Sequence, residues 1–99
     1  MSWGYRAMFV LLDTYKRRHG CDTLRQMVTR WAPPTENDTE AYIRTVATRS
    51  RVPADSRIST DNREIMVPIV EAMSFVENGV PAVAADVEAG WKLFIRYRP

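Results

Sequence analysis

Apolar side chains recur at helical spacing in five segments of this chain, whereas residues 51–60 show no such period. In the first segment, Met8, Leu11, Leu12 and Tyr15 follow one another at intervals of three, one and three residues, which places them on one face of a helix. No run of alternating apolar and polar residues predicts a strand. We therefore expect an all-α fold, a compact bundle of about five helices.

The expected helix ends carry residues with known capping preferences. Gly20 and Gly79 are suited to left-handed caps. Thr23 with Gln26 fits a capping box at the start of the second helix. Asp61 with Glu64 fits a second capping box at the start of the fourth helix. The expected helices cover residues 2–18, 23–32, 39–50, 62–77 and 81–94, and the tail 95–99 is expected to be frayed.

Composition excludes several classes of protein. The 99 residues are 45 % hydrophobic and 26 % charged, which is typical of a globular domain, so we expect one helical domain over 1–99. The apolar stretch 7–12 is far shorter than the roughly 18 residues that span a bilayer, and no signal-peptide pattern is present. We therefore expect synthesis in the cytoplasm and no membrane partner.

The sequence lacks the residue spacing of a metal site and that of a catalytic nucleophile with its base. The chain has one cysteine and one histidine, Cys21 and His19, which are too close in sequence for a usable catalytic dyad. Asp55, Asp61 and Asn62 lack the alternating spacing of a calcium loop. We expect no metal and no cofactor.

A mildly basic balance raises the question of nucleic-acid binding. The chain has 14 basic and 12 acidic side chains, and its first two expected helices are joined by a short turn, as in a helix-turn-helix. The second helix offers only Arg25, Gln26 and Thr29 as polar residues for base recognition. A small arginine-rich nucleic-acid binder is therefore our third hypothesis, and a solvated arginine face is the simpler interpretation.

Two glutamates stand in unusual local settings. Glu77 ends an apolar helix, where a carboxylate opposes the helix dipole, and Glu36 follows the rigid Trp31-Ala32-Pro33-Pro34 corner. Two carboxylates about 5 to 9.5 Å apart can perform glycosidase chemistry. Glu77 and Glu36 are therefore the candidate catalytic residues.

The residues beside these glutamates supply the other candidates. Trp31, Asn37 and Asn78 are the candidate ligand-binding residues. The simpler alternative is structural: Glu36 pairs with an arginine such as Arg30, and Glu77 accepts hydrogen bonds within the fold.

The same segments resemble a family of phage and prophage virion structural proteins. The resemblance covers about residues 2–94. The matching segments are Trp3-Gly4-Tyr5-Arg6-Ala7, Tyr15-Lys16-Arg17-Arg18-His19-Gly20, Trp31-Ala32-Pro33-Pro34, Glu36-Asn37-Asp38-Thr39, Tyr42-Ile43 and Glu77-Asn78-Gly79. Full-length family members begin earlier, with an Asn-Asn-Pro-Gly-Asn-Ile-Arg motif that this chain lacks. The resemblance thus implies an N-terminally truncated form of a longer domain.

The family pattern is itself similar to cell-wall glucosaminidases and lysozyme-like proteins, in which a catalytic glutamate lies at a helix end. By this analogy Glu77 would be the acid. The resemblance implies a virion structural or virion-associated protein that is related to peptidoglycan hydrolases and non-catalytic in this form. The alternative is an active peptidoglycan enzyme that uses Glu77 and Glu36, either a muramidase-like or glucosaminidase-like glycosidase or a lytic transglycosylase.

The resemblance also implies partners. These are other virion proteins, a second copy of the chain, or peptidoglycan. Trp3, Trp91 and Phe94 are expected to stay partly exposed, where the missing N-terminal segment would pack.

Overall fold

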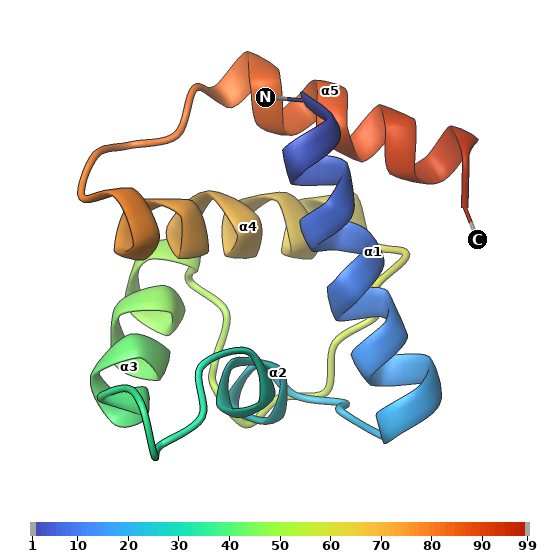
Figure 1. The fold of residues 1–99 in the computed structure, drawn as a ribbon. Coiled ribbons are helices and arrows are strands. Elements are labelled where there is room, and N and C mark those ends of the chain that lie inside the picture. The colour runs from blue at the N-terminus through green and yellow to red at the C-terminus, as the bar shows by residue number, and fades with distance from the viewer. Residues whose placement is uncertain (1, 99) are drawn as a thin grey trace.

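The computed structural model describes residues 2–98, which form five helices joined by loops (Figure 1). The helices are α1 Ser2–His19, α2 Leu24–Trp31, α3 Thr39–Ser50, α4 Arg63–Asn78 and α5 Ala84–Arg96. Within the described residues there is no strand, and one isolated antiparallel bridge joins Thr23 to Arg57. The expected all-α bundle is confirmed. None of the helices in this part of the chain is long and apolar enough to cross a membrane.

The helix ends follow the capping chemistry closely. Thr23 accepts a hydrogen bond from the backbone N–H of Gln26, whose side chain accepts in return from the N–H of Thr23, which completes the capping box. Gly20 and Gly79 both adopt positive φ angles, of 64° and 74°, after α1 and α4. These left-handed conformations strain any residue with a β-carbon, so glycine suits both positions.

Two helix starts differ from expectation. The N-cap of α4 is Asn62, whose side chain accepts from the N–H of Glu64, rather than Asp61. Helix α5 begins at Ala84 instead of 81, because residues 80–83 are not helical and Val83, in an extended conformation, takes the cap position.

Tyr97 and Arg98, after the end of α5, make contacts within the fold. Helix α5 continues to Arg96, and the N–H of Tyr97 donates to the carbonyl of Leu93. Arg98 lies near the carboxylates of Asp13 and Asp61. Pro99 lies outside the described residues.

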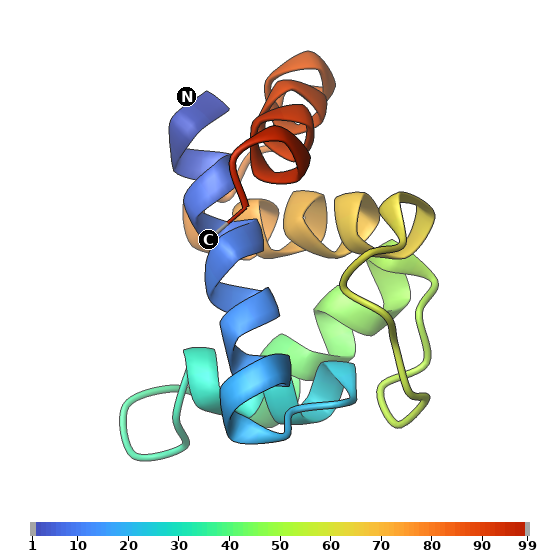
Figure 2. The same ribbon diagram turned by 90° about the vertical axis from the view of Figure 1, so that its right-hand side faces the viewer.

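Helix α4 crosses the middle of the molecule, with α5 on one side and α2 and α3 on the other (Figure 1). Helix α1 packs most extensively against α5, and α3 packs against α4. Figure 2 shows the N-terminal half of α1 beside α5. The largest fully buried side chains come from all five helices; they are Phe9, Phe94, Leu12, Leu24, Met27, Met66, Ile69, Met73, Val28, Val46, Val70 and Val87.

An aromatic cluster joins α1 to α5. The ring of Phe9 lies 5.1 Å from that of Trp91, in an edge-to-face arrangement, and 6.0 Å from that of Phe94. Trp91 and Phe94 are 7 % and 0 % exposed, so the expectation that they stay partly open was wrong: α1 itself covers them. Trp3 is 61 % exposed, as expected, and lies 6.0 Å from the Tyr97 ring.

The crossing of α1 and α5 is close because one residue lacks a side chain. Gly90 is buried, and a β-carbon there would lie 2.6 Å from the β-carbon of Tyr5 and 2.9 Å from the carbonyl oxygen of Ser2. The backbones can therefore approach only with glycine at position 90.

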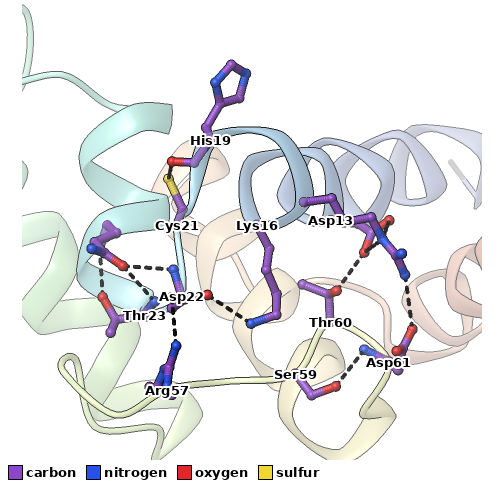
Figure 3. A network of polar contacts seen from close by, with 12 residues as sticks. Asp13, Lys16, His19, Cys21, Asp22, Thr23, Arg57, Ser59, Thr60 and Asp61 are labelled. Carbon is purple, nitrogen blue, oxygen red and sulfur yellow. Dashed lines mark hydrogen bonds and ion pairs between the residues drawn. The ribbon is translucent and has the colours of Figure 1, made fainter.

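The long loop between α3 and α4 is held to α1 by polar contacts (Figure 3). The buried carboxylate of Asp13 accepts hydrogen bonds from Thr60, at 2.6 Å, and from Arg17, at 2.8 Å. Further along, Asp22 accepts from Lys16, at 3.1 Å, and from Arg57, at 3.2 Å. A buried carboxylate needs such partners, because an uncompensated charge in the interior is costly.

Candidate functional site

Three of the five candidate site residues line one pocket. Trp31 ends α2, and Glu77 and Asn78 end α4, while the start of α1 forms the opposite wall. We refer to this hollow of about 190 Å³ as the Glu77 pocket. Its lining residues are Gly4, Tyr5, Met8, Trp31, Ser74, Glu77 and Asn78.

One wall of the Glu77 pocket is a short chain of hydrogen bonds. The Tyr5 hydroxyl and the Ser74 hydroxyl are 3.0 Å apart, and the Asn78 side-chain amide donates to the Ser74 oxygen at 3.2 Å. Because the amide nitrogen of Asn78 is engaged with Ser74, its position is held and its carbonyl oxygen is available as an acceptor. This wall can therefore receive a hydrogen bond from a ligand.

The indole of Trp31 is fixed in the same way. Its Nε1–H donates to the hydroxyl of Tyr42 at 3.0 Å. Tyr42 comes from α3 and is only 8 % exposed. Burial, and after it the negative charge of Glu77, raises the pKa of Tyr42 to about 12, although the hydrogen bond from Trp31 opposes this. The charge on Glu77 therefore acts on a buried phenol beside the pocket.

Glu77 itself is exposed and takes part in no ion pair within residues 2–98. A carboxylate at the C-terminal end of a helix opposes the helix dipole, at a cost of about 0.3–1 kcal/mol. The structural alternative predicts that Glu77 accepts a hydrogen bond within the fold. In the described part of the chain, Glu77 accepts no hydrogen bond. Its carboxylate is thus free to meet a ligand.

Glu36 and Asn37 lie apart from the Glu77 pocket. The backbone N–H of exposed Glu36 and the side-chain amide of Asn37 both donate to the carbonyl of Pro33, at 3.1 and 3.2 Å. Asn37 lines a separate hollow of about 350 Å³ between α2 and α3. Of the two candidate carboxylates, Glu77 alone lines the Glu77 pocket.

The pairing of Glu36 with Arg30 is also not observed. No ion pair among residues 2–98 includes Glu36, and the Arg30 guanidinium lies over the Tyr15 ring, 5.5 Å from its centre. Because neither glutamate has a cationic partner among the described residues, ion pairing there does not explain them.

The other sites that the sequence raised have simple structural roles. The Cys21 thiol donates to the backbone carbonyl of His19 at 3.8 Å, and the His19 ring points away from it (Figure 3). Within residues 2–98 no three acidic, histidine or cysteine side chains are grouped as metal ligands. Arg25, at the start of α2, bonds to Asp55 at 2.7 Å and to Glu40 at 3.0 Å, so its charge is already matched.

Sequence reasoning missed the hydrogen bond by which Tyr42 holds Trp31 of the pocket. Its position in the apolar stripe of α3 marked it as a core residue, and it is one. The available signal was its hydroxyl, because a buried tyrosine usually finds a hydrogen-bond partner.

Comparison with known proteins shows that the chain is similar to a phage protein. No family model matches it, and no solved structure does. The sequence is 37 % identical over 90 residues to Protein P5 of Pseudoalteromonas phage PM2, a match that covers 90 % of this chain and 54 % of the relative. The chain thus spans about half the length of that relative. It is a homologue of a phage protein.

Proposed function

We propose that this chain is a virion-associated phage or prophage protein. The similarity to Protein P5 of phage PM2 carries the proposal, since it extends over 90 % of the chain. Trp3 and Tyr97, 61 % and 50 % exposed and adjacent to each other, offer an aromatic contact for another virion protein or a second copy.

We further propose that the fold is related to peptidoglycan hydrolases and that the Glu77 pocket binds glycan without cleaving it. The support is the grouping of Glu77, Trp31 and Asn78. A carboxylate and an amide oxygen accept bonds from sugar hydroxyls, and an aromatic side chain can pack against the apolar part of a ring. A single carboxylate favours binding over hydrolysis, because glycosidases of the common kinds use two.

Particle association is tested by density-gradient centrifugation of lysates from a bacterium that carries the gene. We expect mass spectrometry to find the chain in the band that contains phage particles. In a matched host with the capsid genes deleted, it should remain at the top of the gradient. Recovery of the chain outside the particle band in both hosts would contradict virion association.

Glycan binding and hydrolysis are separated by two assays on purified peptidoglycan. We expect the chain to sediment with the insoluble glycan and to release no reducing sugar even at high protein concentration. Glu77→Gln should weaken the co-sedimentation, whereas Glu36→Gln, which alters an exposed carboxylate outside the pocket, should not. Sugar release that is abolished by Glu77→Gln would instead establish the alternative, an active glycosidase.

A further inference from the structure

A second hollow, between α3, α4 and the linker that joins α4 to α5, carries two opposite charges. Arg49, in the last turn of α3, and Glu71, within α4, both line this space of about 190 Å³, which we refer to as the Arg49–Glu71 hollow. Figure 1 shows the end of α3 against α4, on the side where the linker to α5 leaves. The other lining residues are Pro68, Ala72, Pro81 and Ala82.

The guanidinium of Arg49 is held in place by an aromatic ring. Its central carbon lies 3.6 Å from the centre of the Phe75 ring, well inside the range of a cation–π contact. Glu71 and Phe75 are four residues apart in α4, so their side chains share one face of that helix. The positive charge of Arg49 is therefore fixed over the face of α4 that also carries Glu71.

The two charges do not pair with each other. No ion pair among residues 2–98 includes Arg49 or Glu71. Neither side chain makes a hydrogen bond in this part of the chain. By contrast, Arg25 bonds to Glu40 and Asp55. The hollow thus presents unused N–H donors beside an unused carboxylate.

The remaining walls are rigid and carry no charge. Pro68 and Pro81 have fixed φ angles and no backbone N–H, and Ala72 is buried. Glu71 is half-buried, so a ligand that reaches it displaces little water. Opposite charges that are held apart in one hollow match a small ligand that carries the same two charges in the reverse order.

We propose that the Arg49–Glu71 hollow binds the head group of an α-amino acid. The carboxylate of the ligand accepts hydrogen bonds from the Arg49 guanidinium, and its ammonium donates to Glu71. Two sources present this head group: a free amino acid, and the diaminopimelate side chain in stem peptides of peptidoglycan. The inference goes beyond virion association and does not rest on glycan binding at the Glu77 pocket.

An NMR titration of the ¹⁵N-labelled protein with three related compounds tests both charges. Alanine carries the whole head group, N-acetylalanine lacks the ammonium, and alaninamide lacks the carboxylate. We expect alanine to bind with a Kd of roughly 1–10 mM and to shift the amide resonances of Arg49, Glu71 and Ala82. Each analogue should bind about tenfold more weakly, because one charge-assisted contact is lost.

Substitutions test the same two contacts from the side of the protein. Arg49→Gln and Glu71→Gln should each weaken alanine binding about tenfold. Arg44→Gln is the matched control, because Arg44 is an exposed arginine of the same helix that lines a different hollow. Its binding should equal that of the wild type, and the amide spectrum of each variant verifies its fold.

Three outcomes would overturn the inference. They are the absence of shifts at about 100 mM alanine, equal binding of all three compounds, and equal binding of alanine by the wild type, Arg49→Gln and Glu71→Gln. Arg49 is exposed, so its replacement removes the charge without opening the core.

Co-sedimentation with two kinds of peptidoglycan distinguishes the sources of the head group. Diaminopimelate-type peptidoglycan presents it on stems that are not cross-linked, whereas lysine-type peptidoglycan presents an ammonium alone. If the polymer is the source, Arg49→Gln should weaken co-sedimentation with the first type and not with the second. If Arg49→Gln sediments like the wild type with both, the ligand is a free amino acid. A wild type that binds alanine but no peptidoglycan refutes the glycan proposal and leaves this inference intact.

Discussion

Replacing Gly90 by alanine should destabilise the protein, although alanine is the better helix former. The new β-carbon would lie 2.6 Å from the β-carbon of Tyr5, 2.9 Å from the Ser2 carbonyl oxygen and 3.0 Å from the Arg6 nitrogen. Carbon atoms in contact are normally about 3.5–4.0 Å apart, so α1 and α5 must separate by about 1 Å at their crossing. Two of the three neighbours are backbone atoms, which cannot move aside as a side chain can.

The magnitude follows from two opposing terms. Overpacking a core costs about 1–3 kcal/mol, and the Gly→Ala exchange within a helix returns about 0.5–1 kcal/mol. We expect a net loss of about 1–2 kcal/mol in the free energy of unfolding, which lowers the melting temperature by about 5–15 °C in a domain of this size. The loss should be largest if the shift also loosens the Phe9 and Trp91 contact.

Urea unfolding followed by circular dichroism measures this effect, with Gly4→Ala as the matched control. Gly4 lies in α1, and a β-carbon there would meet nothing within 4 Å, so only the gain in helix propensity applies. Gly4→Ala should therefore stabilise the protein by about 0.5–1 kcal/mol. If Gly90→Ala stabilises it equally, the close crossing of α1 and α5 is not present in solution.

Three further predictions concern polar groups. Asp13→Asn should cost about 1–3 kcal/mol in urea unfolding, because it weakens a buried set of charged hydrogen bonds, whereas Asp61→Asn on the exposed side of the network should cost little. Thr23→Ala should cost about 1 kcal/mol through the lost capping box, and Thr48→Ala, at an exposed position of α3, should be close to neutral. The raised pKa of Tyr42 predicts an alkaline loss of stability: the unfolded chain ionises near pH 10 and the folded chain near pH 12, so stability is full below pH 10 and falls through this interval. Urea midpoints at pH 9 and pH 11 should therefore differ less in Tyr42→Phe than in wild type, and an equal difference would refute the burial of the phenol.

Local chemistry accounts for most of the helix positions. The Thr23 capping box and the glycines at 20 and 79 act within a few residues of themselves, so the sequence predicts them well. Helix α5 shows the limit, because a proline at 81 suits a first turn but does not require one.

Contacts between distant segments were not predictable in the same way. Trp91 and Phe94 are buried by α1 because Gly90 permits the close crossing, and helical periodicity does not identify which helix will cover a given face. The separation of Glu36 from the Glu77 pocket has a similar origin. It depends on the conformation of the loop after Pro33, which local propensities leave open.

The packing of α1 against α5 has a consequence for the synthesis of the protein. Helix α1 leaves the ribosome first, but the 64 residues between His19 and Ala84 must follow before its main partner begins. At about 5–20 residues per second, this delay lasts roughly 3 to 13 seconds. During that time the ring of Phe9 lacks Trp91 and Phe94, so the nascent chain presents the apolar face of α1 to chaperones. A truncated mRNA that ends before the codons of α5 should therefore yield a chain that is degraded, because α1 never packs against α5.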